Sequence, residues 1–255
     1  MRRVLSVLAC GLAGLVVPVS GAAAGASAIV RMPLDRAAVR GTVGSTNWSG
    51  YATYNATFTD VKGSWIQPTA TCSTSGHRYA AFWVGLDGYN SNSVEQIGTD
   101  SDCLNKNRPS YYAWIEMYPA APVNLSSSKY PVAPKDSISA EVKASGSSYT
   151  LVLTNTTRAW SYTTTQSSTT AQNSSAEWVA EAPSSCFITC SVLPLANFGT
   201  VNFTGSATTG NGQVGTISTF TNDSIVMTTN SGTVKAQPSA LANNGASFSD
   251  TWRHA

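Results

Sequence analysis

Charged residues are scarce in this chain, and so is histidine. Asp, Glu, Lys and Arg make up 11% of the 255 residues, and the two histidines are His77 and His254. From Thr46 onward, ten basic and twelve acidic residues stand singly, without a basic cluster. Nucleic-acid-binding proteins carry basic patches, so we expect no nucleic-acid partner.

Several common catalytic patterns are missing as well. The sequence has no GxSxG elbow, no HExxH pair and no Walker loop. A Ser-His-Asp triad would depend on His77, in a Gly/Ser loop, or on His254, next to the C-terminus. Neither histidine stands in zinc-ligand spacing with the cysteines. We therefore expect no metal and no cofactor, and carboxylates remain as the obvious acid and base groups.

Residues 1–28 have the three-part layout of a secretory signal. Arg2 and Arg3 precede a short apolar run, which is interrupted by Gly and Pro and followed by small residues. The run is too short and too broken for a comfortable membrane span. The sequence predicts a secreted, extracellular protein with no membrane anchor after signal cleavage.

The rest of the chain divides near Thr46. Residues 29–45 are basic and irregular, and we interpret them as a pro-segment or a flexible N-terminal arm whose arginines could mask an acidic cleft. Residues 46–255 are enough to form one large β domain but too few for two domains of ordinary size. Nothing in the sequence requires a partner protein, so a monomer is the simplest expectation.

Four cysteines remain after export, an even number in an oxidising compartment. Three pairings are possible. We favour Cys72–Cys103 and Cys186–Cys190, because the second pair lies close in sequence around the loop CFITC.

Beyond Thr46, short β-rich runs alternate with Gly, Ser, Asn, Asp and Pro clusters, and no long helical periodicity occurs. This pattern predicts an all-β fold, an antiparallel β-sandwich of two packed sheets. The low-complexity stretch 163–175 is expected to be a long exposed hairpin loop. The expected strands are 63–66, 80–86, 93–97, 111–118, 137–144, 149–154, 159–163, 176–182, 200–204, 215–220 and 224–229.

Strand alternation assigns faces to the polar residues. In 111–118, Glu116 shares a face with the aromatic residues at 112, 114 and 118. In 176–182, Glu177 and Glu181 lie on the face opposite Trp178, roughly 13 Å apart at about 3.3 Å per residue. They cannot share a proton at that distance, so each needs a partner from elsewhere. Alternation does not decide whether Gln96 faces inward.

Four segments in a fixed order carry a family resemblance: NWSGY at 47–51, AFWVGLDG at 81–88 with VEQIG at 94–98, WIEMYP at 114–119, and AEWVAEAP at 176–183. Together they resemble the glutamic peptidases, the eqolisin family. The resemblance implies two seven-stranded sheets with a substrate cleft. It also implies acid endopeptidase activity on polypeptides without metal or cofactor.

The resemblance places the family's catalytic glutamine on Gln96 and its catalytic glutamate on Glu181. Glu181 would take a proton from the attacking water and return it to the leaving amine, and the Gln96 amide would donate to the oxyanion. Tyr112 stands where an acidic residue can occur, which leaves the subsite preference open. The supporting substrate-binding positions are Trp48, Trp83, Asp87, Glu116 and Tyr118.

Other interpretations of these residues stay open from the sequence. Tryptophans in a β-sandwich are often core residues, and Asp87 in LDGYN suits a turn. A non-catalytic carbohydrate-binding sandwich would use exposed tryptophans to stack on sugars. A glycosidase would use Glu116 and Glu181 as its carboxylate pair.

Overall fold

The computed structural model describes residues 28–38 and 42–255. The predicted signal peptide, residues 1–28, lies outside the described residues except for Ala28. Two short 3-10 turns, η1 (Ile217–Thr219) and η2 (Asn243–Gly245), are the helical elements of the described part. No helix in that part is long and apolar enough to cross a membrane.

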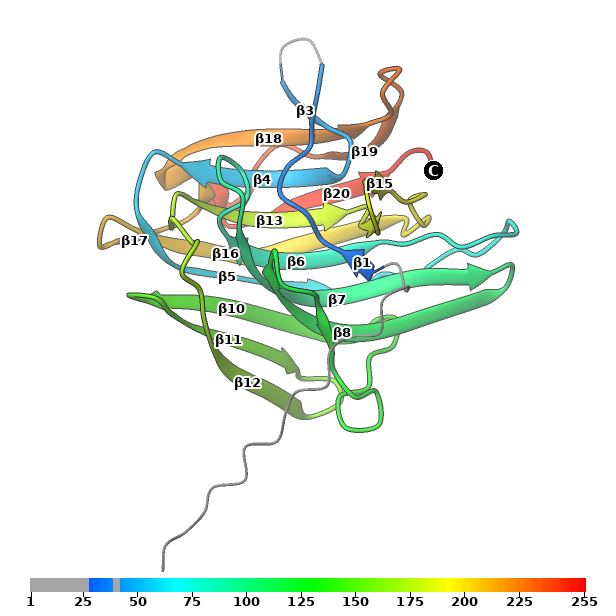
Figure 1. Cartoon of the computed structure of the whole chain (residues 1–255), viewed down its shortest axis with the longest axis horizontal. Coiled ribbons are helices and arrows are strands. Elements are labelled where there is room, and N and C mark those ends of the chain that lie inside the picture. The colour runs from blue at the N-terminus through cyan, green and yellow to red at the C-terminus, as the bar shows by residue number, and fades with distance from the viewer. Residues whose placement is uncertain (1–27, 39–41) are drawn as a thin grey trace, which may run out of the picture.

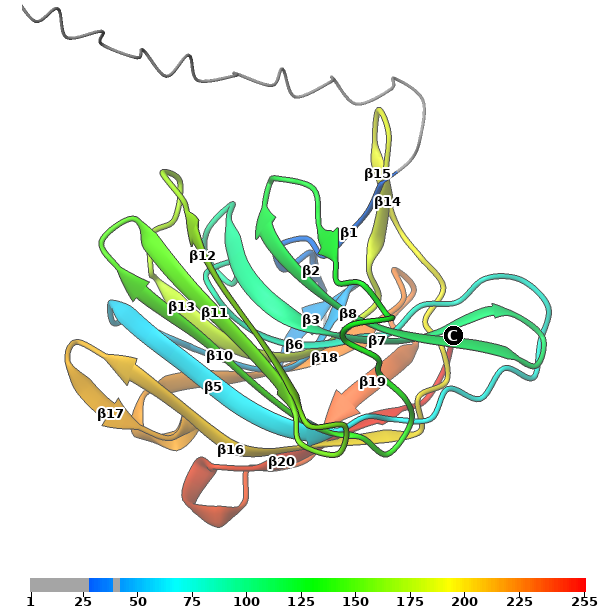
Figure 2. The same cartoon turned by 90° about the horizontal axis from the view of Figure 1, so that it is seen from below.

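The strands form two packed layers (Figures 1 and 2). Along the first layer, neighbouring strands are β12 (Trp160–Ser167), β11 (Ser148–Asn155), β10 (Ser137–Ser145), β5 (Phe58–Ile66), β16 (Thr200–Gly210), β20 (Phe248–Trp252) and β19 (Val234–Pro238). Along the second they are β18 (Thr221–Thr228), β4 (Trp48–Tyr54), β13 (Ser175–Glu181), β6 (Ala81–Leu86), β7 (Val94–Asn105), β8 (Arg108–Tyr118) and β9 (Val123–Asn124). Pairing of β18 with β19 joins the layers. The predicted β-sandwich is confirmed.

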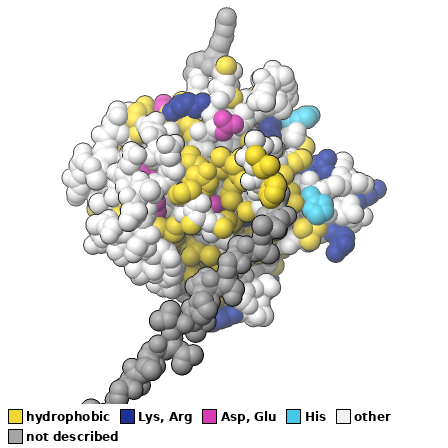
Figure 3. Space-filling view, viewed as in Figure 1, with side chains coloured by type: hydrophobic (Ala, Val, Ile, Leu, Met, Phe, Trp, Pro, Cys, Tyr) yellow, Lys and Arg dark blue, Asp and Glu magenta, His cyan; other side chains and the backbone are white. Residues whose placement is uncertain are grey.

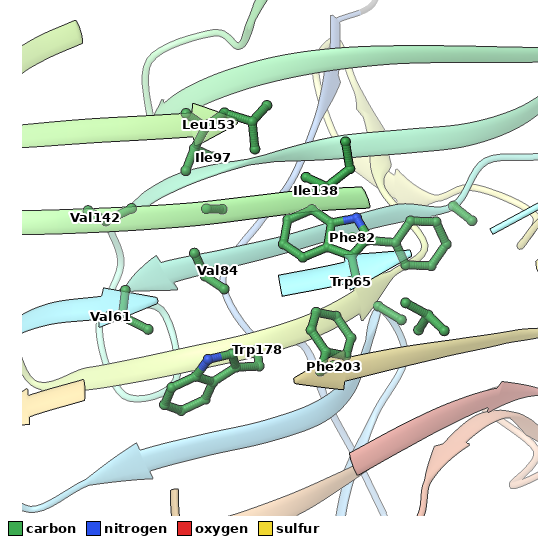
Figure 4. Packing of buried hydrophobic residues seen from close by; sticks show 14 of the residues in the cluster. Val61, Trp65, Phe82, Val84, Ile97, Ile138, Val142, Leu153, Trp178 and Phe203 are labelled. Carbon is green, nitrogen blue, oxygen red and sulfur yellow. The ribbon is translucent and has the colours of Figure 1, made fainter. Parts of the chain in front are cut away.

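The main hydrophobic core lies between the layers, and Figure 4 shows part of it. Trp178 of β13 is fully buried there, and its indole N–H donates to the Lys62 carbonyl oxygen at 2.8 Å. Ala176 and Ala180 face the same core, as strand alternation predicted. The opposite face of β13, which carries Glu177 and Glu181, is therefore turned away from this core.

Two sequence predictions about local structure were wrong. Residues 215–220 do not form one strand, because β17 (Gln213–Gly215) ends at Gly215 and η1 follows. The chain folds back so tightly that a Cβ at Gly215 would lie 2.5 Å from the side chain of Thr219. The stretch 163–175 is not a hairpin loop, because β12 pairs with β11 whereas β13 pairs with β4 and β6. Its first residues, 163–167, belong to β12, and residues 168–174 cross from one layer to the other.

The structure forms the disulfides Cys72–Cys103 and Cys186–Cys190, the pairing favoured from the sequence. The second closes the tip of a hairpin made by β14 (Ser184–Cys186) and β15 (Cys190–Val192).

The ordered part of the chain begins before Thr46. β1 (Ala28–Val30) pairs with β14, β2 (Arg36–Ala37) pairs with β3 (Val43–Ser45), and β3 runs parallel to β18. Figure 1 shows the segment after β1 passing in front of the second layer. At residues 28–30, 36–37 and 43–45 this segment is thus paired with other strands of the fold.

Candidate active site

The predicted catalytic residues lie on the outer face of the second layer, where β4, β13, β6, β7 and β8 are adjacent. Gln96 of β7 is directly opposite Gly85 of β6 and Glu116 of β8. Glu181 of β13 is directly opposite Trp48 of β4. Since directly paired residues of antiparallel strands share a face, these side chains project from the same side of the sheet.

Trp83 lies between these two groups and contacts the glutamate. Its indole N–H donates to Glu181 Oε2 at 2.8 Å, and its ring meets that of Trp48 edge to face at 5.0 Å. Gly98 is paired with Trp83 on the neighbouring strand. A Cβ at Gly98 would lie 2.3 Å from the Phe82 carbonyl oxygen and 2.6 Å from Trp83 Cβ. The glycine thus lets β6 and β7 approach closely enough to seat Trp83.

Gly98→Ala should therefore destabilise the fold and disturb the indole that holds Glu181. Relieving contact with a backbone oxygen requires strands β6 and β7 to shift, and overpacking of this kind costs about 1–3 kcal/mol. Denaturant unfolding of the wild type and the variant measures the change in free energy of unfolding. An unchanged unfolding midpoint would show that the sheet absorbs the methyl group freely.

The N-terminal segment occupies this face, and one of its peptide units contacts both predicted catalytic residues. The Gln96 side-chain amide donates to the Arg31 carbonyl oxygen at 2.7 Å. The Met32 backbone N–H donates to Glu181 Oε1 at 3.1 Å. The amide and the carboxylate thus meet the two ends of the Arg31–Met32 peptide bond.

Two further predicted residues contact the same stretch of backbone. Glu116 Oε2 accepts from the Arg31 N–H at 2.9 Å, and the Trp48 indole N–H donates to the Met32 carbonyl oxygen at 2.9 Å. All of these side chains are buried under the segment, none exposing more than 1% of its surface. Trp48, Trp83 and Trp114 belong to a hydrophobic cluster of the cleft that is separate from the main core.

Burial raises the pKa values of two carboxyl groups of the site. It raises the pKa of Glu181 well above its usual range, and the neighbouring Glu116 raises it further. Burial likewise raises the pKa of Glu116 to about 8, against the lowering effect of the Arg31 charge. With the segment in place, both groups therefore hold protons more tightly than exposed glutamates do.

The sequence prediction missed the site of the Arg31 side chain. Its guanidinium donates to Asp100 Oδ2 at 2.7 Å and to the Tyr112 hydroxyl at 3.3 Å, and it lies 4.2 Å from the centre of the Trp114 ring. Asp100 shares the even-numbered face of β7 with Gln96. Alternation from Gln96 could therefore have identified Asp100 as a residue of the cleft.

A family model described as the Peptidase A4 family matches residues 46–249. The chain belongs to the Peptidase A4 family. Aspergillopepsin-2 from Aspergillus niger is 31% identical over 195 residues, which cover 67% of each protein. The crystal structure of aspergilloglutamic peptidase from Aspergillus niger is 29% identical, with a TM-score of 0.59 over 69% of this chain and 99% of that one.

A second solved structure shows the fold shared with this family. Scytalido-glutamic peptidase bound to a transition state analog inhibitor has a TM-score of 0.71 at 23% identity, over 82% of this chain and 98% of that one. This Peptidase A4 family member is a glutamic endopeptidase. The carbohydrate-binding and glycosidase interpretations are set aside by its family.

Two of the predicted substrate-binding residues do not join Gln96 and Glu181 in these contacts. The Asp87 carboxylate accepts from the backbone N–H groups of residues 172, 173 and 174 at 2.7–2.8 Å, so it anchors the crossing between the layers. Tyr118 is partly buried against the aromatic cluster. It also lines a groove of about 640 Å³ beside Met32, Pro33 and Leu34. Figure 3 shows hydrophobic side chains gathered near the middle of this face.

Among residues 28–38 and 42–255, the structure brings together no group of three or more His, Cys, Asp or Glu side chains suited to a metal ion. The chemistry available at the peptide unit is that of a carboxyl group and an amide.

Proposed function

We propose that Glu181 and Gln96 are the catalytic pair of a secreted endopeptidase that works at acid pH. The observation that carries the proposal is their contact with one peptide unit, Gln96 on the Arg31 carbonyl oxygen and Glu181 on the Met32 nitrogen. A peptide-bond hydrolase needs a hydrogen-bond donor at the carbonyl oxygen and a group that can deliver a proton to the nitrogen.

The mechanism follows from these positions. Glu181, as the carboxylate, takes a proton from a water molecule that attacks the carbonyl carbon. The Gln96 amide then stabilises the oxyanion that forms, which an acceptor-only carboxylate could not do. Glu181 returns the proton to the nitrogen as the C–N bond breaks, and Trp83 holds its other oxygen in place.

We also propose that residues 29–45 are a pro-segment that keeps the site closed. The segment removes Glu181 from water, and this burial is the largest cause of its raised pKa. Once the segment leaves, water returns and the pKa of Glu181 falls toward its usual range. Glu181 is then mostly ionised in mildly acidic solution, whereas with the segment in place only a minority of molecules carry the carboxylate that can start the reaction.

Export and the substrate class complete the proposal. The signal-like layout of residues 1–28 and the two disulfides support secretion into an oxidising medium. Polypeptides as substrates are supported by a relative of the eqolisin family that was solved in complex with the tripeptide Ala-Ile-His.

Cleavage of an unfolded protein by the full chain tests the proposal. We expect fragments at acid pH and little cleavage at about pH 8, where Glu116, whose pKa is raised to about 8, loses its proton. A metal chelator should have no effect, because carboxyl and amide groups carry the chemistry. Gln96→Ala should lower kcat by about 10²–10³-fold, since it removes an oxyanion donor.

The same assay can also contradict the proposal. A folded wild type that leaves the protein intact over the whole range from about pH 3 to about pH 8 would contradict the proposal. A Gln96→Ala variant with wild-type turnover would remove glutamine from the mechanism. Circular dichroism spectra confirm that wild type and variant share the fold.

A further inference from the structure

Arg31, the residue before the contacted peptide bond, places its charged side chain in a buried pocket. The Arg31 side chain is 1% exposed, although arginine is rarely buried without a partner. Its partners are Asp100, Tyr112 and the face of Trp114. Burial alone would lower the pKa of Arg31, but the Asp100 carboxylate raises it on balance, so the guanidinium keeps its charge.

The pocket is held in shape by contacts that do not involve Arg31. The Trp114 indole N–H donates to Asp100 Oδ1 at 2.5 Å. The Tyr112 hydroxyl lies 2.8 Å from Asp100 Oδ2 and 3.0 Å from Asp102 Oδ2. Asp102 also accepts from the Ala80 N–H at 3.2 Å. Strands β7 and β8, together with Ala80 just before β6, thus fix the acidic wall before any cation enters.

The pocket has a definite position relative to the chemistry. Arg31 supplies the carbonyl group that Gln96 contacts, so its side chain occupies the site for the residue immediately before the hydrolysed bond. Glu116 holds the N–H of the same residue. Backbone and side chain of Arg31 are therefore recognised together, as a substrate would be.

We propose that this pocket selects substrates with a cationic side chain, arginine above all, immediately before the cleaved bond, and that Arg31–Met32 is the first such bond to be hydrolysed. This inference rests on the catalytic roles proposed above. Arginine suits the pocket better than lysine because its planar guanidinium both stacks on Trp114 and donates to two oxygens.

The reaction at Arg31–Met32 is ordinary hydrolysis. Water adds its oxygen to the Arg31 carbonyl carbon, the C–N bond breaks, and Glu181 delivers the water's proton to the Met32 nitrogen. The products are an Arg31 carboxylate and a chain that begins at Met32. When the product that ends at Arg31 dissociates, the acidic pocket is empty and can bind the next substrate.

Matched peptides test the pocket. Peptides with the sequence of residues 28–35 are compared with arginine, lysine, leucine or citrulline at the position of Arg31, where citrulline keeps the shape and removes the charge. The enzyme is the full chain after incubation at acid pH. We expect kcat/KM to be about 10- to 100-fold higher for arginine than for citrulline, the size of a hydrogen bond to a charged group. Tyr112→Phe and Asp100→Asn should reduce this ratio. Asp250→Asn should keep it, because Asp250 is a buried carboxyl of β20 that contacts Ser49 on the face of β4 turned away from this site.

The N-terminus of the incubated chain gives a second readout that needs no pocket variant. Wild type sampled early in the incubation should begin at Met32, before the rest of the segment is removed, and Glu181→Gln should keep Arg31. Digestion of an unfolded protein without preference for arginine, or a first cleavage of the chain at a bond other than Arg31–Met32, would overturn this inference and leave the proposed function standing. Failure to digest any substrate would instead contradict the proposed function.

Discussion

Replacing Glu181 with glutamine should lower the rate of peptide-bond cleavage by about 10²–10⁴-fold. Glutamine keeps the length and shape of the side chain, and its one carbonyl oxygen can still accept from the Trp83 indole N–H. Its NH2 group replaces the oxygen that accepts from the Met32 N–H, a contact that is lost anyway when the segment leaves. It cannot take a proton from water and return it to the leaving amine. The loss should therefore appear in kcat, with little change in the free energy of unfolding.

Asp250→Asn is the matched control for this variant. Asp250 is as deeply buried as Glu181, and its carboxylate accepts from the Ser49 hydroxyl at 3.0 Å. Ser49 points to the face of β4 opposite Trp48, so Asp250 lies away from the cleft. Initial rates on an unfolded protein substrate, with enzyme concentration fixed by absorbance, compare the two variants. Equal rates for Glu181→Gln and Asp250→Asn would contradict the role of Glu181.

The free energy of unfolding should fall as the pH rises from about 4 to about 8. Burial raises the pKa of Glu95 and of Glu116 to about 8 and that of Asp250 to about 7. In this range the folded chain holds protons that the unfolded chain releases. Stability from these groups is thus fully present below the ordinary carboxyl pKa and is lost as the pH passes through the raised values.

Asp250 alone shows the size of the effect. One pH unit of difference between folded and unfolded pKa corresponds to about 1.4 kcal/mol, so the rise from 3.8 to about 7 corresponds to about 4 kcal/mol. Urea unfolding at a series of pH values measures it. Asp250→Asn should flatten the decline, because asparagine does not titrate. Stability that is constant or increases between about pH 4 and about pH 8 would contradict this account.

Alternation was the most reliable part of the sequence prediction. It placed Trp178 in the core and Glu181 on the other face of the same strand, because β13 pairs without a bulge and is buried on both sides. It failed at 215–220, where Gly215 ends a strand and a hydroxyl-rich turn follows. Hydroxyl-bearing residues such as Thr216 suit strands and turns alike, so β-propensity alone could not find that boundary.

Contacts between distant segments were harder to predict. The sequence predicted that basic residues mask an acidic cleft, yet nothing in it indicated that Arg31 meets Asp100, 69 positions away. That contact depends on how the segment after β1 lies across β7 and β8. Asp87 shows the opposite case, since its turn role follows from LDGYN alone, whereas the crossing segment it anchors appears only in the fold.

Strands β4, β13, β6, β7 and β8 pair without a bulge around Gln96 and Glu181. This pairing also determines where residues can be inserted or deleted. Gln96 and Glu181 contact one peptide unit because alternation along β7 and β13 turns both side chains to the same face of the sheet. Inserting or deleting a single residue between Val94 and Gln96 would turn Gln96 toward the main core and carry Asp100 with it. The turn between β7 and β8, at residues 106–107, lies beyond the last paired position and is exposed. Natural or engineered length variation in this enzyme should therefore accumulate at such turns, while the strands of the cleft accept only substitution.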